Sequence, residues 1–240
     1  MSARGRFAAV IIGAAGLAVA GSASADPGFG GSVVVTTDYV FRGLSQTQND
    51  GAIQADLHYQ WLAGWFAGAW ASNVRFEAPD SPNREYNLYL GYARQLTADW
   101  SGRVAVVHYG YPGDATDYDY DELAVSTDYQ NRLFLTVAWS PNVSRYSYNY
   151  GAAHHRAEIS YEINGRQPLK YGVSAAAGGG YYDLTDLFGR SYWAANGGLV
   201  YGYRDFQLDV TYYWVSGEAR DIFGPTAARD HWVATLLWRF

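Results

Sequence analysis

The residues best suited to bind a metal ion stand in one acidic segment, Asp117-Tyr-Asp-Tyr-Asp-Glu122, which places carboxylates at alternating positions. Oxygen-rich clusters of this kind suit Ca²⁺, but the segment lacks the glycine and the distal glutamate of an EF-hand loop. We therefore interpret it as a solvated acidic segment at the outer rim of a membrane barrel. There it bridges lipopolysaccharide through divalent cations or tunes the passage of cations. No metal site and no cofactor are expected.

Three other patterns invite a catalytic or phosphate-binding interpretation. His154 and His155 have no cysteine or carboxylate at the usual spacing of zinc ligands, so we interpret the pair as a strand edge. Gly178-Gly179-Gly180 lacks the Lys-Ser/Thr ending of a phosphate-binding loop, and we expect it to let a strand bend at the rim. Barrel hydrolases use Ser and His, but the sequence has no Gly-x-Ser-x-Gly elbow, so we predict no catalytic residues and no enzyme.

The elements that carry these residues alternate between apolar and polar side chains, and the end of the chain shows this most clearly. In the segment 231–240, His231, Thr235 and Arg239 share one face, and the opposite face carries Trp232, Ala234, Leu236, Trp238 and Phe240. Period two with one apolar face is typical of a barrel strand that crosses a membrane. An aromatic last residue resembles the C-terminal signal that outer-membrane proteins present to the barrel insertion machinery, which is therefore an expected partner.

We predict an all-β fold, an antiparallel transmembrane β-barrel of about 12 strands. Short and long connections alternate, which is the asymmetry of short periplasmic turns and longer extracellular loops. The predicted short connections lie near Leu62–Gly64, Leu96–Asp99, Gln130–Asn131, Asn164–Pro168 and Arg204–Asp205. The predicted long ones lie near Gly43–Asp50, Glu77–Asn83, Tyr111–Asp119, Ser140–Ala153, Gly178–Arg190 and Ser216–Arg229.

The first 25 residues have the features of a secretory signal peptide. Arg4 and Arg6 precede an apolar run, and Ala23-Ser24-Ala25 forms a small-x-small cleavage site. We expect residues 1–25 to be this signal and residues 26–240 to form the outer-membrane barrel. The chain has no Cys, 22 Tyr and 9 Trp, which fits a barrel with aromatic girdles at both lipid boundaries. Its formal charge of −6 makes nucleic acid an unexpected partner.

Charged residues of both signs fall on the face that we predict to be inward. Facing lipid, each Arg or Lys would cost about 2–4 kcal/mol at the midplane of the bilayer. These side chains either line a channel or pair across the lumen and stiffen the barrel. The predicted lining of the lumen and its mouth is Asp38, Arg42, Asp56, His58, Asn73, Arg75, Glu85, Arg103, Glu122, Asp128, Arg156, Glu158, Glu162, Lys170, Asp209 and Arg239.

Two segments carry a resemblance to a known family, Thr37-Asp-Tyr-Val-Phe-Arg-Gly-Leu-Ser-Gln-Thr47 and Gly64-Trp-Phe-Ala-Gly-Ala-Trp-Ala-Ser-Asn-Val-Arg-Phe76. With Tyr111-Pro-Gly113, they resemble the TorF-type porin family of proteobacteria, which carries a Gly-x-Trp-x-Ser-Asn motif. The resemblance implies an outer-membrane barrel with a porin role and no established substrate. The family often has an acidic residue after Ser-Asn-Val, where this chain has Arg75, so the family's charge selectivity does not carry over.

Together these observations predict a monomeric porin-like channel in the bacterial outer membrane, in contact with lipid and lipopolysaccharide, for passive diffusion of small hydrophilic solutes or ions. A selective channel for oligosaccharides or nucleosides remains an alternative, because Tyr89, Tyr109, Tyr192 and Tyr213 fall inward. The second alternative is a closed barrel with a structural or surface-interaction role and no transport. We also expect Asp38, Arg42, Asn73 and Arg75 to form a polar cluster at the mouth, where Gly43 permits a turn, although Ala and Gly blur the two faces of the segment 65–76.

Overall fold

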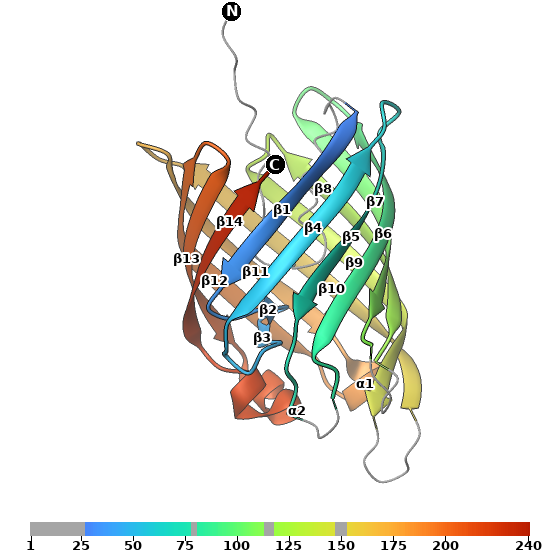
Figure 1. The fold of residues 1–240 in the computed structure, drawn as a ribbon. Coiled ribbons are helices and arrows are strands. Elements are labelled where there is room, and N and C mark those ends of the chain that lie inside the picture. The colour runs from blue at the N-terminus through green and yellow to red at the C-terminus, as the bar shows by residue number, and fades with distance from the viewer. Residues whose placement is uncertain (1–26, 78–80, 113–117, 147–152) are drawn as a thin grey trace, which may run out of the picture.

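The computed structural model describes residues 27–77, 81–112, 118–146 and 153–240, so the predicted signal peptide and parts of three predicted loops lie outside the described residues. Within them, twelve antiparallel strands close into one barrel (Figure 1). The prediction of an all-β barrel is confirmed. The strands are β1 (Gly28–Thr36), β4 (Ala52–Gln60), β5 (Trp65–Asn73), β6 (Arg84–Gln95), β7 (Trp100–Gly110), β8 (Tyr120–Tyr129), β9 (Leu133–Tyr146), β10 (Ala153–Pro168), β11 (Val173–Asp183), β12 (Tyr192–Tyr203), β13 (Phe206–Val215) and β14 (His231–Arg239).

The barrel closes where the first strand meets the last. β1 pairs with β14 from Ser32 opposite Arg239 to Thr36 opposite Thr235, and its other edge pairs with β4. Every strand therefore has a neighbour on both sides, and no barrel strand presents a free edge. This closure satisfies the backbone N–H and C=O groups within the sheet, which a strand structure requires in order to cross a bilayer.

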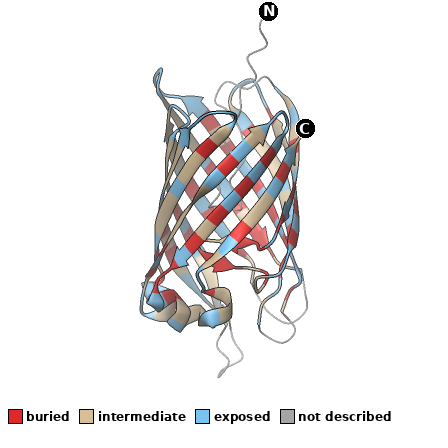
Figure 2. Cartoon of the chain, turned by 90° about the vertical axis from the view of Figure 1, so that its left-hand side faces the viewer, coloured by how far each residue is buried: buried red, intermediate tan, exposed pale blue. Residues whose placement is uncertain are grey.

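Exposed and buried side chains alternate along the strands, as the banding of each strand in Figure 2 shows. On β6 and β7, Leu88 is 52% exposed and Val106 is 54% exposed, whereas the neighbouring Tyr89 and Val107 are buried. Leu, Val, Trp and Tyr dominate the exposed set around the barrel. An apolar outer surface of this extent matches a lipid-facing wall. The predicted outward and inward faces of β14 are confirmed.

Short turns and longer connections alternate, as predicted. The short turns are residues 61–64, 96–99, 130–132, 169–172 and 204–205, at the end of the barrel where β1 begins and β14 ends (Figure 1). The opposite end carries the long connections, with two short helices, α1 (Thr185–Phe188) and α2 (Gly217–Ala227). Neither described helix combines the length and the apolar character needed to cross a membrane.

Three predicted connections were misplaced. The connection predicted to begin at Ser140 begins later, because β9 continues to Tyr146. β10 continues through Asn164 and Gly165, because both residues pair with β9 and β11 at the same time, and the turn follows at residues 169–172. The turn tendency of Asn-Gly is overridden by this pairing on both sides. The Gly178–Gly180 triplet lies within β11 and neither bends a rim nor begins a loop, since the long connection starts only after Asp183.

The first long connection, residues 37–51, folds into the barrel. It contains two short strands, β2 (Val40–Phe41) and β3 (Leu44–Ser45), which pair as a hairpin. Arg42 and Gly43 form its tip with φ angles of 52° and 79°. Tyr39 is only 1% exposed, and Leu44 packs in a cluster with Tyr182, Tyr192 and other residues of the wall and the end loops. The hairpin, which we call the inner hairpin, therefore narrows the lumen on the side of the long connections.

Candidate functional site: a constriction inside the barrel

Arg42, at the tip of the inner hairpin, reaches three glutamates on the barrel wall. Its two terminal nitrogens form ion pairs with Glu122 on β8 and Glu158 on β10. Its Nε lies 3.9 Å from Oε1 of Glu162, also on β10. The Arg42 side chain is 6% exposed, and the three carboxylates are similarly buried. These ion pairs thus hold the hairpin tip against the part of the wall formed by β8 and β10.

Neutral side chains hold the same centre in place. The Arg42 guanidinium lies 4.7 Å from the centroid of the Phe41 ring. The Tyr192 hydroxyl donates a hydrogen bond of 3.1 Å to the Arg42 carbonyl oxygen. Glu122 accepts further hydrogen bonds from the Tyr109 hydroxyl at 3.3 Å and the Ser140 hydroxyl at 3.1 Å. Strands β7, β8, β9, β10 and β12 all contribute, so the geometry is set by much of the barrel.

The charges at this centre do not balance. Three carboxylates face one guanidinium, which leaves a net charge of −2 when all four groups are ionised. Buried charges need compensation, because removing each from water costs several kcal/mol. Carboxylates that line a narrow point of a pore favour cations and repel anions. The arrangement can therefore act as a cation-favouring constriction.

The base of the inner hairpin has its own anchor at Asp38. The Asp38 carboxylate accepts hydrogen bonds from the Ser45 hydroxyl at 2.6 Å and the Thr47 hydroxyl at 2.7 Å. Its second oxygen lies 2.6 Å from Nε2 of His231 on β14. The hairpin is tied both to itself and to the strand that closes the barrel.

A third anchor joins the hairpin to β6. The Tyr39 hydroxyl donates to both carboxylate oxygens of Glu85, at 3.2 and 3.3 Å, and Nδ2 of Asn87 donates to the same carboxylate at 2.9 Å. The Tyr39 ring packs edge-on against Trp70 with centroids 5.4 Å apart. With Arg42 and Asp38, this contact makes three separate polar attachments along one loop.

Further along the lumen, toward the short turns, the wall carries a second group of polar side chains. Nδ1 of His58 lies 2.6 Å from Asp56, which also accepts a 2.5 Å hydrogen bond from the Tyr89 hydroxyl. On the other side of the barrel closure, Gln207 donates to Asp209 at 2.9 Å. These residues form a second polar layer inside the barrel, beyond the constriction.

The structure places most of the predicted lining residues inside the barrel. The residues found inward are Asp38, Arg42, Asp56, His58, Glu85, Arg103, Glu122, Asp128, Glu158, Glu162, Asp209 and Arg239. Tyr89, Tyr109, Tyr192 and Tyr213 also lie inward and are buried. Arg156 is exposed near the start of β10, beside a bulge in the pairing with β9, and not within the lumen.

Besides Arg156, three predicted lining residues lie outside the lumen. Lys170 is exposed in the short turn at residues 169–172. Asn73 and Arg75 are exposed and lie outside the lumen: Asn73 Oδ1 accepts a 2.8 Å hydrogen bond from the Ile53 N–H, and Arg75 pairs with Asp50 at 2.6 Å. β5 instead turns Phe66, Gly68, Trp70 and Ser72 inward, because bulky Phe66 and Trp70 pack inside while alanines face out. The predicted four-residue cluster therefore reduces to Asp38 and Arg42.

Sequence reasoning missed the residues that complete the anchors, namely Tyr39, Ser45 and Thr47. Their signal was present but weak: a long connection that alternates apolar Val40, Phe41 and Leu44 with small hydroxyl residues is unusual for a loop exposed to water. No group of three or more His, Asp or Glu side chains in the described residues is arranged to hold a metal ion.

Comparison with known proteins gives a family and a fold. The family described as "Bacterial protein of unknown function (Gcw_chp)" matches residues 20–237. No curated protein matches the sequence. Among solved structures, the chain is similar to the NanC porin (TM-score 0.57, 11% identity, covering 86% of this chain and 97% of that one) and the KdgM porin (TM-score 0.55, 9% identity, covering 88% and 99%). A KdgM porin in complex with disordered oligogalacturonate gives a TM-score of 0.53 at 9% identity, covering 88% of this chain and 98% of that one. At these identities the likeness shows the fold alone.

Proposed function

The chain belongs to the Gcw_chp family of bacterial proteins, and within that family we propose that it is a porin-like channel for passive diffusion of small hydrophilic solutes or ions. The observation that carries this proposal is a closed barrel with an apolar outer wall and a charged, polar inner wall. A polar, charged interior of this kind is what porin barrels with a water-filled channel have. The porin fold of the similar structures supports the same conclusion.

The constriction suggests the charge preference of the channel. Arg42 and its three glutamates carry a net negative charge where the inner hairpin enters the lumen, so small cations pass more easily than anions. The oligogalacturonate bound by the KdgM porin is a polyanion, and an acidic constriction disfavours such a solute here. For this reason a passive, weakly cation-preferring channel fits better than a selective channel for acidic oligosaccharides.

The same proposal includes the porin type, the location in the cell and the oligomeric state of the channel. The motif Gly68-Ala-Trp-Ala-Ser-Asn73 supports the TorF-type porin identity within the family. The apolar belt supports a bacterial outer-membrane location in lipid and lipopolysaccharide, reached through a signal peptide in residues 1–25 and the insertion machinery that reads the strand ending in Phe240. The channel acts as a monomer without cofactor, and its polar residues serve passage and anchoring instead of catalysis.

Single-channel recording of the refolded protein in a planar bilayer tests the proposal. Discrete, ohmic conductance steps are expected, and the reversal potential under a salt gradient should show a mild preference for cations. The same preparation denatured before addition is the control. A correctly folded barrel that stays silent would overturn the channel and favour a closed structural barrel, since the inner hairpin already narrows the lumen.

A further inference from the structure

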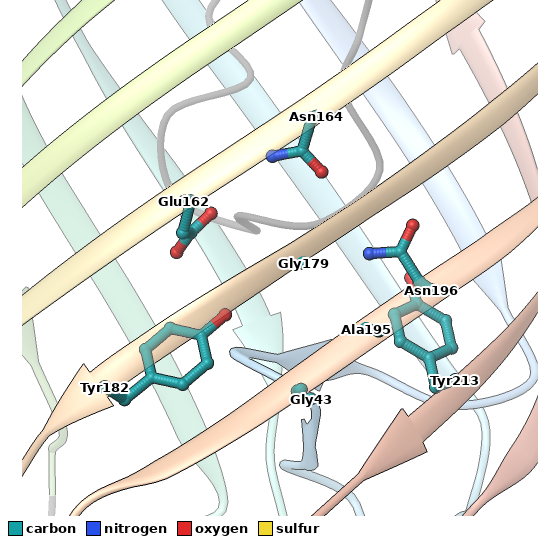
Figure 3. A pocket seen from close by; sticks show the side chains of 9 residues that line it. Gly43, Glu162, Asn164, Gly179, Tyr182, Ala195, Asn196 and Tyr213 are labelled. Carbon is teal, nitrogen blue, oxygen red and sulfur yellow. The ribbon is translucent and has the colours of Figure 1, made fainter.

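A small recess lies in the lumen wall beside the tip of the inner hairpin. It is lined by side chains of β10 to β13 and by Gly43, as Figure 3 shows. Strand register explains why these residues meet: Asn164 on β10 pairs with Gly178, which pairs with Asn196, which pairs with Tyr213. Glu162 occupies the adjacent inward position of β10, opposite Gly180.

Two glycines of β11, Gly178 and Gly180, leave room for the polar side chains beside the recess. A Cβ atom at Gly178 would lie 2.0 Å from Oδ1 of Asn164, and one at Gly180 would lie 2.3 Å from the hydroxyl oxygen of Tyr182. Both distances are far inside van der Waals contact, so any other residue would displace these polar groups. The Gly178–Gly180 triplet therefore has a local purpose in the wall that its position in a strand alone does not explain.

The recess is sized for one small species. Its free volume of about 10 Å³ is room for roughly one water molecule or one bare ion. A sugar or a nucleoside is far too large. The groups that face this space are a carboxylate, two amides and two phenol hydroxyls, from Glu162, Asn164, Asn196, Tyr182 and Tyr213 (Figure 3).

Of the three glutamates around Arg42, Glu162 has the most distant partner. Its side chain is 6% exposed, and within the described residues it accepts no hydrogen bond. The nearest cation is Arg42, whose Nε is 3.9 Å away, while the terminal nitrogens of Arg42 pair with Glu122 and Glu158. The Nε atom of Arg42 is itself buried without a hydrogen-bond partner. One buried carboxylate therefore faces the recess with its charge only partly compensated, in a centre of net charge −2.

We propose that the recess binds a single hard divalent cation such as Ca²⁺. The Glu162 carboxylate is the charged ligand, and the side-chain oxygens of Asn164, Asn196 and the two tyrosines are neutral ligands. Oxygen-only donor sets of this kind suit Ca²⁺ rather than softer metals. A bound divalent ion offsets the excess charge of the Arg42 centre and holds β10, β12 and β13 to the constriction, so the cation preference proposed above is that of the ion-free site. The proposal concerns binding, so it stands or falls independently of conduction.

Terbium(III) luminescence of the refolded full chain in detergent tests this site, because Tb³⁺ replaces Ca²⁺ at oxygen sites and nearby tyrosines sensitise its emission. We expect saturable emission that Ca²⁺ displaces. Glu162→Gln should weaken the binding at least tenfold, and Asp186→Asn, which removes an exposed carboxylate on α1, should leave it unchanged. Heat-modifiable mobility on SDS gels confirms that each variant is folded.

A second variant separates the site from the ion-pair network. Gly178→Ala keeps every charge but places a methyl group against Asn164, and it should also weaken Tb³⁺ binding at least tenfold. Wild-type protein without saturable, Ca²⁺-displaceable emission would show that the recess holds only water. Equal affinity in the folded wild type, Glu162→Gln and Gly178→Ala would show that the ion binds elsewhere. Either result overturns the proposal, whatever the bilayer recordings give.

Discussion

Arg42 and Glu158 are 116 residues apart in the sequence and form a buried ion pair across the lumen. The pair links the tip of the inner hairpin to the wall strand β10. Because Glu122 binds the other terminal nitrogen of the same guanidinium, one side chain fixes the hairpin to two strands of the wall. The position of the hairpin, and with it the width of the passage, depends on this contact.

Removing Arg42 should widen the passage and strengthen its cation preference. In an Arg42→Ala variant the hairpin loses its attachment to β8 and β10, and three carboxylates remain without their guanidinium. We expect a several-fold larger single-channel conductance and a reversal potential shifted further toward cations. Arg75→Ala is the matched control, since it removes an exposed arginine that pairs with Asp50 at the surface. Identical conductance and selectivity in both variants would mean that Arg42 only stabilises the loop.

Thr47 should contribute to the stability of the barrel through the base of the hairpin. Its hydroxyl donates to Asp38 at 2.7 Å, is 2.6 Å from the Asp50 carbonyl and accepts from the Tyr39 N–H at 3.2 Å. Thr47→Val keeps the shape and loses these bonds, so the free energy of unfolding should fall by about 1–3 kcal/mol.

Urea unfolding in lipid vesicles, followed by tryptophan fluorescence, measures this loss. Thr226→Val serves as the control, because the Thr226 side chain lies half-buried on α2 and only its carbonyl oxygen takes part in a hydrogen bond, from Asn49. An unfolding midpoint equal for both variants would show that the Asp38 anchor adds nothing to stability.

Sequence patterns predict the wall of this barrel and most of its inward side chains, but not the hairpin inside it. Alternation identifies the strands because apolar outward and polar inward residues repeat several times along one strand, as they do in β14. The face of Asn73 and Arg75 could not be predicted, since alanines and glycines on β5 give neither face a clear apolar character. The inner hairpin escaped prediction for another reason. Arg42 and Asp38 contact wall residues 80 or more positions away, and Asp38 also contacts buried hydroxyl groups of its own loop, and no local period encodes such contacts.

The outer wall should tolerate no charge at mid-height. Val106 faces outward from the middle of β7 and is paired on both sides, with Leu90 and Leu123. Val106→Arg should cost about 2–4 kcal/mol if this face contacts hydrocarbon. Less protein should then reach the folded form on insertion into vesicles, as measured by heat-modifiable mobility, while Val106→Leu inserts normally. Normal insertion of the arginine variant would contradict a lipid-facing wall.

The orientation of the barrel in the membrane can be read with single cysteines, because the natural chain contains none. The long connections should face the cell exterior and the short turns the periplasm. Asp186 is exposed on α1 and Lys170 is exposed in the turn at residues 169–172, so the two report opposite ends. In intact bacteria, a maleimide too large for the channel should label Asp186→Cys and leave Lys170→Cys unlabelled until the cells are broken. Both variants must first be shown to fold. The reverse labelling pattern would show that the barrel has the opposite orientation in the membrane. The inner hairpin and the Arg42 constriction would then lie on the periplasmic side.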